Sequence, residues 1–86
     1  MRVQLFNKYV GCLPLNKQID CLKRGYKITI NTEKDTDWSN KVLLFIKFDK
    51  NKNIMFACDI NNDDIYKIDV TVPYDYKIKL IDLPNF

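Results

Sequence analysis

The sequence predicts a small all-β protein: an immunoglobulin-like β-sandwich of about six to seven strands, with residues 1–86 forming a single domain. Three observations carry this prediction. First, 86 residues can fill one hydrophobic core, since domains usually hold about 100 to 150 residues. Second, 47% hydrophobic and 29% charged residues are typical of a folded globular chain. Third, apolar residues alternate with period two through the second half, between polar, turn-forming segments.

The first half of the chain predicts two strands and one segment with two readings. Residues 3–6 are apolar enough for a short strand, and residues 26–30 alternate apolar and polar side chains as a strand does. Residues 16–24 place apolar side chains at helical spacing, which predicts one short helix, but a strand closed by a turn at Gly25 fits equally well.

The second half predicts four strands, each with one buried and one wetter face. Polar residues 49–53 and 61–64 predict hairpin loops between them. Because an apolar sheet face must be buried against another layer, this pattern favours the sandwich, with a small SH3-like or OB-like barrel as the alternative. The expected buried face holds the even-numbered apolar residues, namely Val42, Leu44, Ile46 and Phe48, then Ile54, Phe56, Cys58 and Ile60, then Tyr66, Ile68, Val70 and Val72, and finally Tyr74, Tyr76, Ile78 and Leu80.

The residue types present argue against catalysis. The chain has no His, so Ser-His-Asp and Cys-His arrangements lack their base, and its two Gly cannot form a phosphate-binding loop. Cys12, Cys21 and Cys58 show no Cys-x-x-Cys spacing and are expected to be buried free thiols of a reducing compartment. We therefore expect no enzyme activity, cofactor, metal or small-molecule substrate.

Two acidic segments resemble sites without completing one. Residues 59–63 imitate the opening of a calcium loop, but Asp64 and Val70 stand where that loop needs Gly and a bidentate Glu. A polar hairpin is the better interpretation. The acidic residues of 33–37 lie in a hydrophilic loop with no apolar wall to raise a carboxyl pKa, so we expect no acid-base chemistry there.

Charge and hydropathy define the expected partners. The net charge of +3 comes from 14 Lys and Arg against 11 Asp and Glu, interleaved along the chain, which predicts a solvated surface and makes nucleic acid an unlikely partner. No apolar run reaches the length of a signal peptide or a membrane span, so no membrane contact is expected.

A candidate protein interface lies on the other, odd-numbered face of the predicted strands. Leu43, Phe45, Met55 and Ile65 are apolar there although the even face is already assigned to the core. Such residues either pack under a second covering layer or form an exposed apolar surface that docks onto another subunit, and both readings stay open. The expected partner is protein, either a second copy or another subunit.

The order of several short motifs resembles a known family. The motifs are the stretch 25–30, Thr36-Asp37-Trp38, a hydrophobic strand ending in Phe48, a polar hairpin, and Ile68-Asp69-Val70-Thr71-Val72-Pro73-Tyr74. Over residues 19–82 this order is similar to the small immunoglobulin-like β-sandwich domains of tailed-bacteriophage fibre, baseplate and capsid-accessory proteins. The resemblance implies that the Asp-Trp pair closes an edge of the sandwich and that the Val-Pro element enters the penultimate or last strand.

The same resemblance implies a function. We expect a non-enzymatic structural or protein-binding module, a minor virion component such as a capsid decoration, head-fibre or tail-accessory protein, assembled in the host cytoplasm. The alternative is a small cytoplasmic phage protein that inhibits a host enzyme or defence complex.

Overall fold

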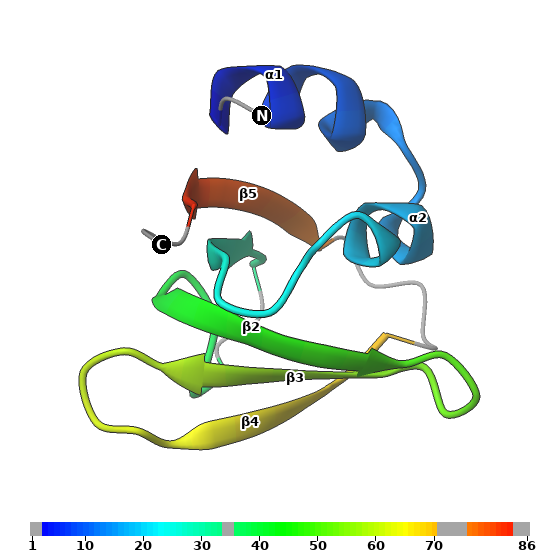
Figure 1. Cartoon of the computed structure of the whole chain (residues 1–86). Coiled ribbons are helices and arrows are strands. Elements are labelled where there is room, and N and C mark those ends of the chain that lie inside the picture. The colour runs from blue at the N-terminus through cyan, green and yellow to red at the C-terminus, as the bar shows by residue number, and fades with distance from the viewer. Residues whose placement is uncertain (1–2, 34–35, 71–75, 84–86) are drawn as a thin grey trace.

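A computed structural model describes residues 3–33, 36–70 and 76–83. The five strands form one open antiparallel sheet in the order β4-β3-β2-β1-β5, and the helices precede it in the chain (Figure 1). The elements are α1 (Val3–Tyr9), the 3-10 helix η1 (Val10–Cys12), α2 (Leu15–Asp20), β1 (Lys27–Asn31), β2 (Val42–Asp49), β3 (Ile54–Asp59), β4 (Ile65–Asp69) and β5 (Lys77–Asp82).

The structure is mostly β, as predicted, but it also contains helices, and six to seven strands and an immunoglobulin-like sandwich are not confirmed. Strands β1 to β4 follow one another as a meander, and β5 returns to pair with β1. The two predicted hairpin loops, at 49–53 and 61–64, join β2 to β3 and β3 to β4 as expected. The described residues provide helices rather than a second sheet as the other layer, and β4 and β5 remain as edges, so a closed barrel is not formed either.

The prediction of a strand at residues 3–6 is wrong, because these residues begin α1. Phe6 and Val10, four positions apart, are both buried in the core, which is the spacing of one face of a helix. Residues 3–6 contain three apolar side chains, too few for period two to be distinguished from helical spacing. None of the helices in the described part of the chain is long and apolar enough to cross a membrane.

Residues 16–24, for which a helix and a strand were both possible, contain a short helix that ends before Gly25. Helix α2 stops at Asp20, and Ile19 is its most deeply buried residue. Gly25 does not cap this helix. It adopts a φ of 95° in the turn before β1, where its N–H donates to the carbonyl of Phe45 at 2.9 Å.

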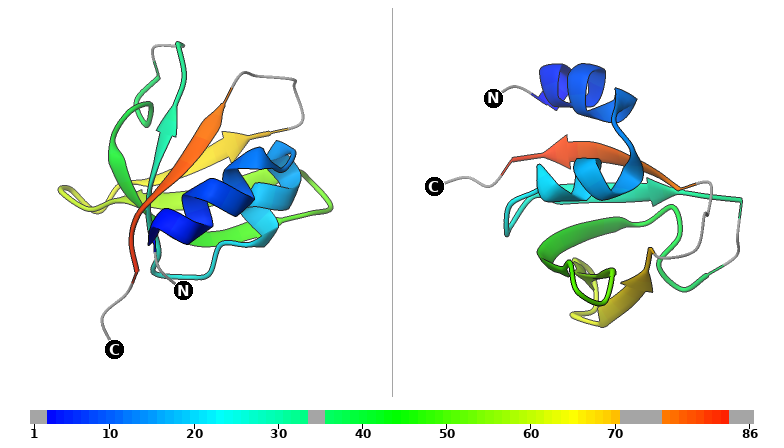
Figure 2. Two further views of the ribbon diagram at one scale, coloured as in Figure 1. Left: turned by 90° about the horizontal axis from the view of Figure 1, so that it is seen from above. Right: turned by 90° about the vertical axis from the view of Figure 1, so that its right-hand side faces the viewer.

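The core collects one face of the sheet and the inward sides of the helices. Both helices lie on the side of β5, whereas β4 lies on the opposite side of the molecule (Figure 1 and the right-hand view of Figure 2). The buried hydrophobic residues are Phe6, Val10, Ile19, Leu22, Ile28, Ile30, Leu43, Phe45, Met55, Ala57, Ile68, Tyr76, Ile78 and Leu80. We call the sheet face that carries the strand members of this set the inner face, and the opposite one the outer face.

The predicted buried face is correct for β5 and β4 but wrong for the start of β2 and for β3. At the start of β2 and along β3 the odd-numbered residues are buried, including Leu43 and Ala57. The register explains this, because Ile28 of β1 pairs with both Leu80 and Leu43 and opposed residues share a face. Ile60, expected to be buried, is 41% exposed in the turn after β3.

A bulge in β2 changes which residues face inward. Phe45 pairs with Ala57, whereas Lys47 pairs with Phe56, so Ile46 is the extra residue. Beyond the bulge it is the even-numbered Phe48 that packs against the core, as predicted.

The Asp-Trp pair of the resemblance lies beside the core. Trp38 is half-buried and meets Tyr76 edge to face, with ring centroids 5.2 Å apart. The Val72-Pro73 element and Tyr74 lie outside the described residues.

Candidate protein-binding surface

Three cross-strand rows build the outer face over β2, β3 and β4. Leu44, Cys58 and Ile65 are opposed in register and form an apolar row. In the next row Lys47 and Lys67 flank Phe56, and the Lys47 Nζ lies 4.9 Å from the centre of the Phe56 ring. The third row has Asp49 and Asp69 on either side of Ile54. The lysines and aspartates thus sit at the margins of an apolar centre.

The outer apolar patch is the name we give to the apolar members of these rows and their neighbours on β2. All are half-buried except Ile65, which is 63% exposed. None of them belongs to the core cluster or to the side chains packed against it, and the helices pack against β5 instead. An antiparallel sheet with one solvated face usually carries polar residues there, so an apolar outer face indicates an interaction surface. The patch comprises Val42, Leu44, Ile46, Ile54, Phe56, Cys58 and Ile65.

Three of the four residues expected at an interface belong to the core instead. Leu43, Phe45 and Met55 have exposed fractions of 0%, 4% and 1%. These side chains are therefore covered by other parts of the chain and do not form an exposed docking surface. Ile65 alone is exposed, and it lies on the outer face at the edge strand. β2 is apolar on both faces, and periodicity cannot decide which face is buried; only the pairing of Ile28 with Leu43 does so.

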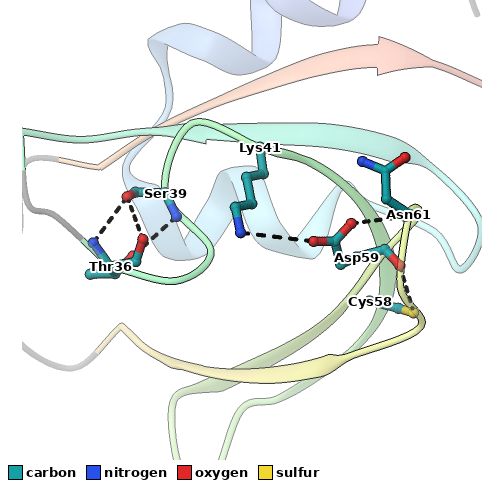
Figure 3. Close-up of polar contacts among 6 residues, drawn as sticks. All are labelled: Thr36, Ser39, Lys41, Cys58, Asp59 and Asn61. Atoms are coloured by element: carbon teal, nitrogen blue, oxygen red, sulfur yellow. Dashed lines mark hydrogen bonds and ion pairs between the residues drawn. The ribbon is translucent and has the colours of Figure 1, made fainter.

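A buried carboxylate lies at the end of β3, next to the patch (Figure 3). Asp59 Oδ1 accepts the Asn61 N–H at 2.8 Å, and Asp59 Oδ2 lies 4.0 Å from the Nζ of Lys41. The backbone of Asp59 also donates to the carbonyl of Asp64 at 2.8 Å and accepts from the N–H of Asp63 at 3.1 Å. Asp59 therefore shapes the hairpin turn, as a polar hairpin requires. Within the described residues no three His, Cys, Asp or Glu side chains are grouped to hold a metal ion.

The loop that leads into β2 is held by short polar contacts. The Thr36 N–H donates to Ser39 Oγ at 3.1 Å, and the Ser39 N–H donates to Thr36 Oγ1 at 3.0 Å (Figure 3). Asn40 has a φ of 58° and donates its N–H to the carbonyl of Ile30 at 3.0 Å. These bonds fix where β2 starts relative to β1, and so which residues of β2 face the core.

Tyr66, on β4, is the titratable group with a perturbed environment. Burial raises the pKa of its phenol above 10.0, and the carboxylates of Asp59, Asp64 and Asp37 raise it further, while Lys41 acts in the opposite direction. A phenol whose pKa is raised stays neutral at physiological pH. It contributes a hydroxyl to the β4 edge and no charge.

The three cysteines are free thiols. The expected burial is wrong for Cys12 and Cys21, which are exposed near the helices, whereas Cys58 is half-buried in the apolar row of the outer face. Among the described residues, none of the three belongs to a group of His, Cys, Asp or Glu side chains that could hold a metal ion.

A shallow hollow of about 290 Å³ lies between the helices and β5, and the amides of Asn7 and Gln18 that line it already bind backbone carbonyls. The Asn7 Nδ2 donates to the carbonyl of Leu80, and the Gln18 Nε2 donates to the carbonyl of Leu13 at 2.7 Å. Asn31, Lys77 and Lys79 remain as its exposed polar groups. Exposed polar side chains around a shallow hollow are a weaker site than the outer apolar patch.

Comparison with known proteins found no matching family model, curated protein or solved structure.

Proposed function

We propose that this protein is a non-enzymatic protein-binding module that docks through the outer apolar patch. One observation carries the proposal: six of the seven patch residues are half-buried and Ile65 is exposed, on a sheet face that none of the described helices covers. Burying such a face against a partner removes apolar area from water, which is the main favourable term in protein association. The lysines and aspartates at its margins supply a polar rim.

The resemblance over residues 19–82 supports a virion subunit as the partner, so we further propose a minor virion component with capsid-decoration, head-fibre or tail-accessory character. A cytoplasmic inhibitor of a host enzyme or defence complex would use the same patch. Mass spectrometry of purified virus particles and of the cleared lysate separates these two, because a virion component co-purifies with particles and an inhibitor stays in the lysate.

Docking through the patch is tested by a matched pair of lysine substitutions. Leu44→Lys places a charge in the β2 part of the patch, whereas Asn31→Lys places it on the exposed end of β1, where Asn31 pairs with Lys77 and with no patch residue. We expect proteins captured by the tagged parent chain to be retained by Asn31→Lys and lost with Leu44→Lys, at unchanged melting temperature. Equal capture by both variants would mean that the docking surface lies elsewhere.

A further inference from the structure

The two edges of the sheet are treated differently by the rest of the chain. At the β5 edge, the side chain of Asn7 from α1 binds both backbone groups of Leu80: its Oδ1 accepts the Leu80 N–H at 2.8 Å and its Nδ2 donates to the Leu80 carbonyl at 3.0 Å. A side-chain amide thus occupies the site where another strand would pair. Helices and side chains that cover a sheet edge prevent further strand addition.

The β4 edge carries no such cover among the described residues. The bonds from the Asp59 N–H to the Asp64 carbonyl, and from the Val70 N–H to the Asn53 carbonyl, fix the phase of the β3–β4 ladder. In an antiparallel pair, hydrogen-bonded and non-hydrogen-bonded positions alternate. The backbone N–H and C=O groups of Ile65 and Lys67 therefore point away from β3, toward the outside of the sheet.

The side chains of these same two residues end two rows of the outer face. Ile65 ends the apolar row that begins at Leu44, and Lys67 ends the row in which two lysines flank Phe56. A strand added at the β4 edge would extend each row by one residue. Opposed side chains favour apolar pairs and opposite charges, so the added strand needs an apolar residue beside Ile65 and an acidic one beside Lys67.

We propose that the β4 edge binds an extended segment of another protein as an additional antiparallel strand, with an acidic residue opposite Lys67 and, two residues later, an apolar residue opposite Ile65. This rests on the proposed function, and it names the partner chemistry: main-chain hydrogen bonds supply affinity, and the two outward side chains supply specificity.

The charge pattern of β4 disfavours its full-length pairing with a second copy of this chain, and the register that sets Lys67 against Asp69 pairs only residues 67–69 of the strand. The longest antiparallel pairing of β4 with itself sets Lys67 against Lys67, and like charges directly opposed are destabilising. A shifted pairing sets Ile65 against Ile65 and Asp63 against Lys67. Asp63, however, has a φ of 58° and donates to the Asp59 carbonyl, so it belongs to the turn and not to an extended strand.

The test uses short synthetic peptides of alternating Thr and Val in which the central residue is Glu or Lys and the residue two positions later is Val. We expect the Glu peptide to bind the intact protein about fivefold more tightly than the Lys peptide, since that swap replaces an attractive cross-strand pair by a repulsive one. Binding should slow hydrogen exchange at the amides of Ile65 and Lys67. The Lys67→Glu variant should bind the Lys peptide more tightly than the Glu peptide.

A second variant tests the main-chain bonds. Ile65→Pro removes one outward N–H and no bond to β3. It should therefore weaken the binding of both peptides without changing the fold, because proline is tolerated at a sheet edge where the N–H faces outward. Three results would overturn the proposal. The Lys67→Glu variant could still prefer the Glu peptide, the peptide could slow hydrogen exchange at Leu80 instead of Ile65, or neither peptide could bind at millimolar concentration. So would a dimer that protects the same amides without peptide. If Leu44→Lys abolishes capture while the peptides fail, the patch docks its partner and the edge does not.

Discussion

The outer face of the sheet changes character between its two halves. Over β1 and β5 it carries Lys27, Thr29, Lys77 and Lys79, a solvated surface of the usual kind. Over β2 and β3 it carries aliphatic residues, Phe56 and Cys58. Both halves turn the same inner face to one core, so the difference does not serve the interior.

The contrast shows which apolar residues the fold needs. Removing an inner-face side chain leaves a cavity in a close-packed core, whereas an outer-face side chain has solvent on one side and few core contacts to lose. The apolar half of the outer face is therefore available to a partner at little cost to the stability of the monomer.

The largest expected difference in the free energy of unfolding is between truncations of two phenylalanines on opposite faces of the sheet. Phe45→Ala should lower the free energy of unfolding by about 3–5 kcal/mol, because Phe45 is 4% exposed in the core. Phe56→Ala, on the outer face, should cost about 1 kcal/mol or less. Urea denaturation followed by Trp38 fluorescence measures both, and equal losses would contradict the face assignment.

Removing the Asn7 contacts at the β5 edge should lower the free energy of unfolding by a smaller amount. Asn7→Ala removes both bonds to Leu80, and at about 0.5–1.5 kcal/mol for each typical bond the loss should be about 1–3 kcal/mol. Exchange of the Leu80 amide should accelerate. Asn62→Ala, in the exposed β3–β4 turn, is the control and should leave both quantities within error. An Asn7→Ala variant with unchanged Leu80 exchange would mean that α1 does not close this edge.

The smallest expected effect is the alkaline titration of Tyr66 on β4. Its pKa is raised above 10.0 in the folded chain, so the contribution to stability is present below pH 10 and is lost as pH rises through the folded-state pKa. Tyr66→Phe should flatten that part of the dependence of unfolding free energy on pH.

A second variant tests the cause of this shift. Lys41→Met should move the phenolate absorbance transition to still higher pH, because Lys41 lowers the pKa of Tyr66. A transition that moves downward would rule out the proximity of Lys41 to the phenol.

How far the sequence predicts the fold differs between the same two halves. β1 and β5 alternate Ile or Leu with Lys, Thr or Asp along most of their length, so their faces follow from period two alone. The run Val42 to Ile46 is apolar throughout, and no local pattern distinguishes its two faces. The decision comes from pairing Ile28 with Leu43, a long-range contact set by the loop that Thr36, Ser39 and Asn40 shape.

The same limit applies to the candidate site. The sequence predicts an interface on odd-numbered apolar residues, of which those on β2 and β3 are buried in the core and Ile65 on the edge strand β4 is exposed. The closed β5 edge could not be predicted, because it depends on Asn7 reaching Leu80 across 73 positions of sequence. The helical start cannot be predicted from residues 3–6, because the three apolar residues Val3, Leu5 and Phe6 carry no distinguishable period.

The most direct test places one charge on either face of β2 at adjacent positions. Leu43 is fully buried and Leu44 lies in the outer apolar patch. Leu43→Asp should unfold the chain, because an unpaired carboxylate in the core is strongly unfavourable. Leu44→Asp should stay folded, with a free energy of unfolding within about 1 kcal/mol of the parent. If Leu44→Asp unfolds and Leu43→Asp does not, the apolar patch is the core and the account of both faces is wrong.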